Sequence, residues 1–230
     1  MGMHIGLVAV KTSSAQFSEI FSHVWTNYEV VTTADKFNDA NAMWAWKETN
    51  EKFVSAADWS KDNPGKEVYF FWQDGPWATM MDESYTLAAD EENLKILSSQ
   101  VGTVLSFIVE TAGGCAFFMC FENGILRRKI SNNDSEITTE GDPLPEETGI
   151  DTSNYYMNET ESLLKAFGLS PINEMPLSEG CRAICVTDRT DYEYLKTNIA
   201  NEQKSYEMNN DASPNNPNVS SSKKPWWKLW

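Results

Sequence analysis

The chain has 230 residues, of which 41% are hydrophobic and 12% aromatic, as in a globular protein large enough to bury its own core. Its 34 acidic and 18 basic residues give a formal net charge of −16, which opposes nucleic-acid binding because phosphate contacts depend on lysine and arginine. No apolar run approaches the ~20 residues of a membrane span, and residues 1–10 lack the pattern of a signal peptide. We therefore expect a cytoplasmic protein that binds no nucleic acid.

The negative charge is concentrated in the second half of the chain. Residues 132–222 hold 17 acidic and 5 basic residues, whereas residues 1–131 hold 17 and 10. Such a surface attracts a basic protein partner. The alternative is that the acidity only keeps the protein soluble.

The chain begins with a predicted strand, helix and strand. Residues 5–10 form a short apolar run, and Ser13 or Ser14 is a suitable cap for a helix with an apolar stripe over residues 17–24. Residues 28–32 are rich in β-branched and aromatic side chains. A strand–helix–strand unit of this kind favours a parallel pair of strands with a right-handed crossover.

A helix is predicted over Phe37–Trp59, followed by a break at Asn63–Gly65. Two apolar runs then flank Gln73–Pro76, which predicts a hairpin. Asp90–Leu97 is predicted to be a helix, with acidic residues in its first turn where the helix dipole favours them.

Three apolar runs follow, Thr103–Glu110, Cys115–Phe121 and Ile125–Ile130. Asn123-Gly124 separates the second from the third and is a strong hairpin signal, because a type I′ turn needs positive φ at both central residues. We expect an antiparallel meander at the centre of the fold.

Fewer apolar residues follow the meander. Gly141–Glu147 is predicted to be an extended loop, and Glu159–Phe167 a helix that ends at Gly168. Arg182–Thr187 is predicted to be a late strand and Tyr192–Ile199 a final helix.

These elements predict an α+β fold with a mixed, mainly antiparallel sheet and helices packed against it. We expect a single domain over residues 1–200, a disordered linker rich in Asn, Ser and Pro over residues 201–222, and a Trp/Lys motif over residues 223–230.

The C-terminal motif is the sharpest functional feature, because a polar linker separates its aromatic residues from the core. Tryptophan is enriched in binding hot spots and, beside lysine, at membrane interfaces. The motif is predicted to dock on a partner, with weak membrane contact or folding back onto the domain as alternatives. Its docking residues are Trp226, Trp227, Trp230, Lys223, Lys224 and Lys228.

The other six tryptophans all precede residue 78. Aromatic rings offer a large contact area with a polar handle, so Trp44, Trp46, Trp72 and Trp77 are candidates for lining a ligand groove. The alternative is that they pack in the core.

No pattern for catalysis, metal binding or a cofactor is present. The four cysteines lack zinc-site spacing and are expected to be reduced and buried, and neither histidine is placed to pair with one of them. Four acidic clusters are expected to lie on the solvated surface: Asp82–Glu83, Asp90–Glu92, Glu146–Glu147 and Asp188–Glu193. We assign no catalytic residue, no metal and no cofactor.

The stretch from Tyr69 to Glu147 combines a Trp-bearing strand pair, a helix, Gly113-Gly114, the Asn123-Gly124 hairpin, Arg127-Arg128 and the loop 141–147. In this order of features it resembles uncharacterised bacterial single-domain proteins, some of which look like immunity proteins of toxin systems. The resemblance rests on structural residues and implies no catalytic residue.

The leading hypothesis is therefore a non-enzymatic protein-binding module, an immunity-type or adaptor protein with an acidic surface. The alternative is a hydrolase whose carboxylates converge near the early tryptophans.

Overall fold

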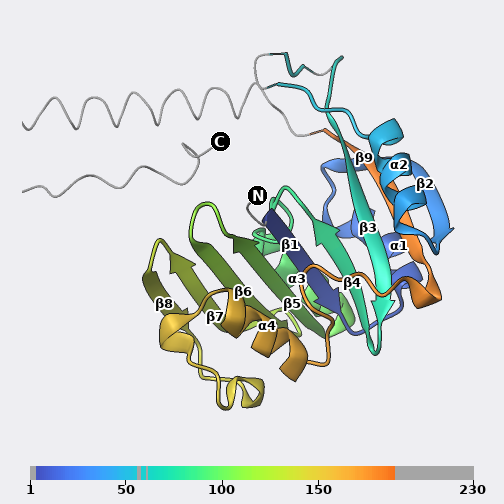
Figure 1. Ribbon diagram of the computed structural model, residues 1–230. Helices are drawn as coiled ribbons and strands as arrows, with labels where there is room; N and C mark the ends of the chain where they lie inside the picture. The colour runs from blue at the N-terminus through green and yellow to red at the C-terminus, as the bar shows by residue number, and fades with distance from the viewer. Residues whose placement is uncertain (1–3, 56–57, 61, 190–230) are drawn as a thin grey trace, which may run out of the picture. The chain divides into compact units, whose positions relative to one another are not determined.

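In the computed structural model, which describes residues 4–55, 58–60 and 62–189, the chain forms a nine-stranded sheet with the order β2-β9-β3-β4-β1-β5-β6-β7-β8 (Figure 1). Every neighbouring pair of strands is antiparallel. The strands are β1 (His4–Val10), β2 (Tyr28–Phe37), β3 (Lys66–Asp74), β4 (Trp77–Asp82), β5 (Thr103–Glu110), β6 (Cys115–Glu122), β7 (Ile125–Asn133), β8 (Glu136–Glu140) and β9 (Cys181–Asp188).

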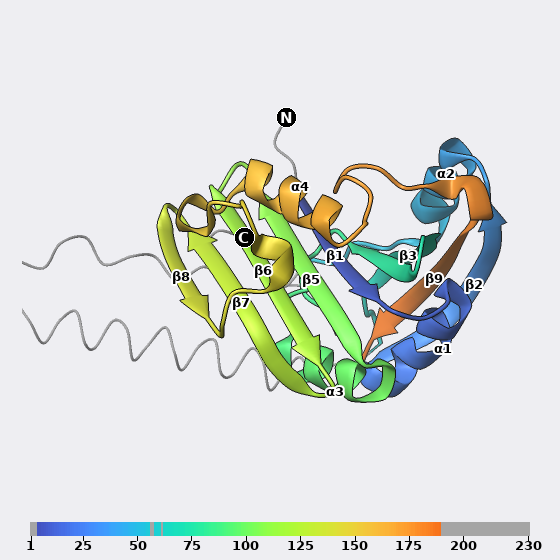
Figure 2. The same cartoon turned by 90° about the horizontal axis from the view of Figure 1, so that it is seen from below.

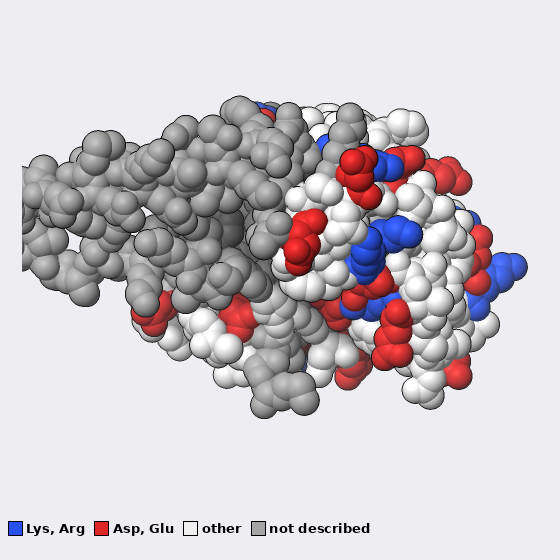
Figure 3. Space-filling view, turned by 90° about the horizontal axis from the view of Figure 1, so that it is seen from above, with Lys and Arg blue, Asp and Glu red and all other residues white. Residues whose placement is uncertain are grey.

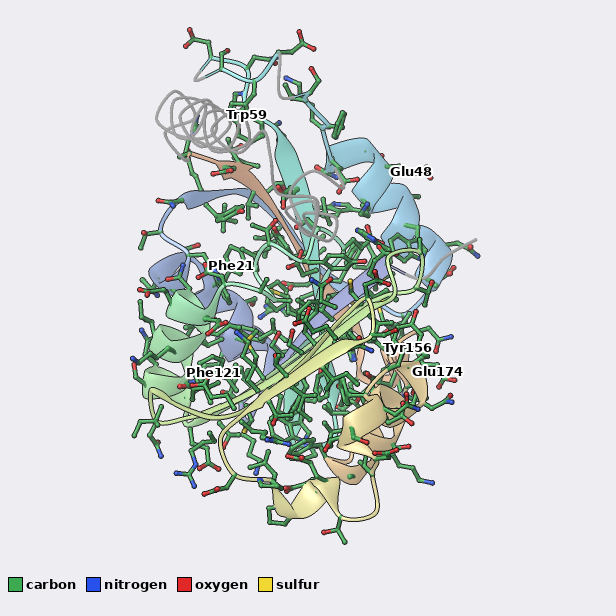
Figure 4. The ribbon with its side chains drawn as sticks, turned by 90° about the vertical axis from the view of Figure 1, so that its left-hand side faces the viewer. Phe21, Glu48, Trp59, Phe121, Tyr156 and Glu174 are labelled. Atoms are coloured by element: carbon green, nitrogen blue, oxygen red, sulfur yellow. The ribbon has the colours of Figure 1, made fainter. Side chains whose placement is uncertain are left out.

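Helices cover both faces of this sheet. The helices are α1 (Ser14–Val24), α2 (Ala40–Asn50), α3 (Glu91–Val101) and α4 (Met157–Ala166), with short 3-10 turns η1 (Pro145–Glu147), η2 (Thr152–Asn154) and η3 (Leu177–Glu179). α1 and α3 pack on one face, and α2 and α4 on the other (Figure 2). In Figure 4 the sheet separates Phe21 and Phe121 on one side from Tyr156 and Glu174 on the other.

The sheet has two cores because side chains alternate along each strand. On β1, Leu7 and Ala9 belong to the core under α2 and α4, whereas Val8 and Val10 belong to the core under α1 and α3. Burial of both faces explains why β1 and β5 are continuous apolar runs rather than alternating ones. The predicted α+β class with a mainly antiparallel sheet is confirmed.

Two expectations about the sheet centre are wrong. β1 and β2 lie in one sheet but are not a parallel pair, because β1 pairs with β4 and β5, and β2 lies at the edge beside β9. Helix α1 crosses the strands between them, packing on β4, β3 and β9. The meander β5–β7 occupies one half of the sheet, and the central strand is β1 (Figure 1).

The long helix predicted over Phe37–Trp59 is also wrong at both ends. Phe37 is the last residue of β2, and Asp39 caps α2 by accepting a hydrogen bond from the amide of Asn41. Beyond Asn50 the chain is irregular, and the amide and carbonyl of Lys52 pair with Lys66. The good helix formers lie only in the middle of the predicted span.

The hairpins are confirmed. Asn123 and Gly124 have φ values of 50° and 81°, which is the conformation that an Asn-Gly turn supplies between β6 and β7. The predicted hairpin around Gln73–Pro76 joins β3 to β4, and the predicted late strand is β9. The predicted helix 159–167 is α4, with Gly168 following at a φ of 75°.

Between β8 and β9 the chain crosses the face that carries α4, through η1, η2, α4 and η3 (Figure 2). We call residues 134–179 the acidic segment, because it holds eleven acidic residues and one basic residue, Lys165. The final helix predicted at Tyr192–Ile199, the domain end at residue 200, the linker 201–222 and the motif 223–230 lie outside the described residues.

Gly141 brings the start of the acidic segment into close contact with β7. Its φ is +79°, and a Cβ built there would lie 2.0 Å from the carbonyl oxygen of Arg127. Gly149 has a similar φ of +85° but nothing within 4 Å. The two glycines therefore share a backbone conformation and differ in their surroundings.

Replacing Gly149 with Ala should lower the free energy of unfolding by about 1–2 kcal/mol, the cost of a left-handed conformation. Gly141→Ala should cost roughly 2–3 kcal/mol more, because the new methyl group displaces the backbone of β7. Urea unfolding of both variants measures the difference. Equal losses of unfolding free energy in the two variants would contradict the close approach of Gly141 to the backbone of β7.

Candidate functional site

The four tryptophans predicted to line a ligand groove, Trp44, Trp46, Trp72 and Trp77, pack in or against the core under α2 and α4. Trp72 and Trp77 are buried on β3 and β4, whereas Trp44 and Trp46 are half-buried on α2. Their rings pack edge-on or tilted against phenylalanines: Trp44 on Phe70, Trp46 on Phe37 and Trp77 on Phe167. Of the four, Trp72 lines a cavity, and the larger groove stays a prediction.

This cavity lies between the sheet and the segment that follows α4. Side chains of β1, β3, β4 and β5 form its floor, including Trp72 and Thr79, which face one another across β3 and β4. Residues 169–171 and Glu174 close it. It encloses about 240 Å³ of free space, counting its open mouth, but no part is wide enough for a water molecule.

A polar cluster that the sequence analysis missed lies where β1 begins and β5 ends. His4 Nδ1 contacts the Glu110 carboxylate, and Tyr85 Oη donates to the same carboxylate at 2.9 Å. The centroids of the His4 and Tyr85 rings lie 3.9 Å apart. The antiparallel register of β1 and β5 brings His4 opposite Glu110, so recognising this cluster required knowing that these strands pair.

The environment of Glu110 favours its ionised form. Burial is the largest single influence and acts to raise its pKa, but hydrogen bonds from His4, the amide of Ala112 and Tyr85 together outweigh it. The pKa of Glu110 therefore lies below its ordinary value of 4.5.

All four cysteines are free thiols; Cys120, Cys181 and Cys185 are buried as expected, whereas Cys115, at the start of β6 beside the turn from β5, is only half-buried. Burial raises the pKa of all four, to about 12 for Cys120 and Cys181, so the thiols stay protonated and weakly nucleophilic at neutral pH. Within the described ranges, no group of three His, Cys, Asp or Glu residues is arranged to hold a metal ion.

Two acidic residues expected at the surface are buried instead. Asp82 is fully buried and accepts hydrogen bonds from the amides of Leu87 and Ala88 at 2.8 and 2.9 Å and from the hydroxyl of Ser84 at 2.7 Å. Burial raises its pKa. Asp82 therefore fixes the turn between β4 and α3.

Glu147 is the second buried carboxylate. It forms a bidentate ion pair with Arg128, with nitrogen–oxygen distances of 2.9 and 2.8 Å, and both side chains are 4% exposed. Arg128 also donates to the carbonyl of Gly141, and Glu147 accepts from the amide of Leu144. This ion pair fastens the start of the acidic segment to β7.

Glu110→Gln should lower stability most near neutral pH. A carboxylate whose pKa is depressed in the folded state stabilises the fold above its unfolded pKa and loses that contribution as the pH falls through its folded pKa. The difference in unfolding free energy between wild type and variant should therefore shrink below pH 4.5. Denaturant unfolding across pH measures it.

Glu122→Gln is the matched control, because Glu122 is exposed on β6 and makes one ion pair, at 3.3 Å with Arg127. Exposed pairs of this kind contribute little, so its effect should be small at every pH. A pH-independent effect of Glu110→Gln would contradict the assignment.

The chain matches no family model, no curated protein and no solved structure. The resemblance of residues 69–147 to immunity-type proteins therefore stays a prediction, as does the docking motif, which lies outside the described residues. No helix of the described part of the chain is long and apolar enough to cross a membrane.

Proposed function

We propose that this chain is a non-enzymatic protein-binding module that holds a basic protein partner against its acidic segment, in the manner of an immunity-type or adaptor protein. The observation that carries the proposal is the uncompensated charge of residues 134–179. Glu140, Asp142 and Glu174 are exposed there, and no basic side chain of the described residues pairs with them.

Elsewhere on the domain, several acidic residues are paired with basic ones. Lys47 on α2 pairs with Glu51 and Glu83 at 2.7 and 2.9 Å, and Lys129 pairs with Glu91. On the face shown in Figure 3, Lys and Arg side chains lie next to Asp and Glu. The net negative charge is therefore denser in the acidic segment than in residues 1–131, which hold 17 acidic and 10 basic residues.

Uncompensated carboxylates in one segment attract a partner of opposite charge before contact. This attraction raises the association rate, suppresses wrong partners and is screened by salt. The bidentate Arg128–Glu147 pair and the packing of α4 on the sheet keep the carboxylates on a fixed scaffold. A preordered surface loses less conformational entropy when it binds.

The hydrolase alternative has less support. Two acidic residues, Asp74 and Glu174, line the same cavity as Trp72. Both oxygens of Asp74 already accept hydrogen bonds from Ser170, one from its amide at 2.7 Å and one from its hydroxyl at 3.1 Å. Asp74 is thereby engaged in holding the segment that follows α4.

Neutralising the charge of the acidic segment should slow partner association. The triple variant Glu140→Gln, Asp142→Asn, Glu146→Gln should lower the association rate with the basic partner, captured from a lysate of the source cells, about tenfold at low salt. The effect should fade as salt is added. Surface plasmon resonance over a salt series measures both.

The matched control removes the same charge elsewhere, through Glu19→Gln, Glu48→Gln and Glu92→Gln, which lie exposed on α1, α2 and α3. This variant should change the rate much less. Equal effects of the two triple variants on the association rate would show that only net charge matters. If the wild type captured no partner and hydrolysed a generic ester, the hydrolase alternative would be favoured.

A second prediction concerns the docking motif. Three tryptophans bury roughly 150–250 Å² each, enough for weak docking of a tethered segment. Deleting Lys223–Trp230 should leave the melting temperature of the domain unchanged and abolish binding to the partner or to anionic vesicles. A large fall in melting temperature would show that the motif packs on its own domain.

A further inference from the structure

Two buried polar atoms in the core under α4 have no hydrogen-bond partner, Trp72 Nε1 and Thr79 Oγ1. Both residues are 2% exposed and both line the cavity described above. A buried donor or acceptor that is left unpaired destabilises a protein, so such groups are rare in native cores and call for an explanation. Two of them facing one another across β3 and β4 point to an absent hydrogen-bond partner.

The cavity as it stands has no space wide enough for a water molecule, so a partner for these two atoms needs the cavity to widen. The segment that closes it, residues 169–174, has no regular secondary structure and lies between α4 and η3. Asp74 holds it through Ser170, and Glu161 holds it through the amide of Ile172 at 3.2 Å. We call residues 169–174 the lid.

The lid also borders a second hollow. Leu169 and Pro171 line this open hollow, with about 580 Å³ of free space, counting its open mouth, together with Glu161, Ser162 and Lys165 of α4. Three hydrogen bonds to carboxylates, two from Ser170 and one from Ile172, hold the lid closed, together with a bond from the amide of Leu169 to Leu164 and the buried side chains of Leu169 and Ile172.

We propose that the lid opens to admit a small uncharged ligand that carries a carbonyl or amide group, which accepts hydrogen bonds from Trp72 Nε1 and Thr79 Oγ1. The indole N–H is only a donor, so the ligand has to supply an acceptor. Apolar side chains, among them Leu7, Phe107 and Leu164, line the same cavity and suit a short hydrocarbon body. The carboxylates of Asp74 and Glu174 line the site and disfavour an anionic ligand.

Propionamide is the probe, and the indole ¹H–¹⁵N resonances of the full chain are the readout. The Trp72 resonance should shift and saturate as propionamide is added. Trp25 is an internal control, because its Nε1 is equally buried and unpartnered but lies in the core under α1 and α3. A lack of response at Trp72, or parallel unsaturated shifts at Trp72 and Trp25, would overturn the proposal.

Two variants sharpen the test. Thr79→Val removes one hydrogen bond to the ligand and should weaken propionamide binding about three- to tenfold. It should also raise the melting temperature of the free protein, because it removes an unpaired buried hydroxyl. A lower melting temperature would show that the hydroxyl is already satisfied, which contradicts the site.

Asp74→Ala removes the two hydrogen bonds that hold Ser170. Because only the lid-open state admits the ligand, a larger open population should tighten apparent binding of propionamide. Unchanged or weaker binding would overturn the role of the lid. These measurements use no protein partner, so their outcome is independent of the proposed binding function.

Discussion

The buried ion pair between Arg128 and Glu147 holds the acidic segment to the sheet. Removing two charges from water costs several kcal/mol, and the cost is offset only when the geometry is good and the remaining hydrogen bonds are made. Both conditions are met, since the pair is bidentate and each partner makes a further bond, to Gly141 and Leu144. The approach of Gly141 to β7 fixes the same point sterically. The position of η1, and the path from there to α4, depends on this anchor.

Much of the fold follows from local signals in the sequence. The Asn123-Gly124 turn, the apolar run of β5 and the glycine after α4 each predict the structure found at that place. The position of β1 does not follow, because a strand buried on both faces presents the same apolar run wherever it lies in the sheet. Which strands flank it depends on long-range pairing with β4 and β5.

The candidate sites depend even more than the fold on contacts between distant parts of the chain. The negative charge of the acidic segment is visible in the sequence, whereas the burial of Glu147 depends on Arg128 meeting it from another element. The cluster of His4, Tyr85 and Glu110 combines residues from three separate parts of the chain. The clustering of tryptophans in the sequence makes Trp72 a candidate ligand-binding residue. No sequence pattern indicates Thr79, which becomes relevant because the pairing of β3 with β4 places it opposite Trp72.

The central claim is that the acidic segment forms the surface that meets a basic protein partner. Amide hydrogen exchange of the full chain, with and without the partner captured from a lysate of the source cells, tests it most directly. The account predicts slower exchange on binding within residues 134–179, with α1 and α3 on the opposite face unchanged. Protection confined to α1 and α3, with no change in the acidic segment, would contradict it.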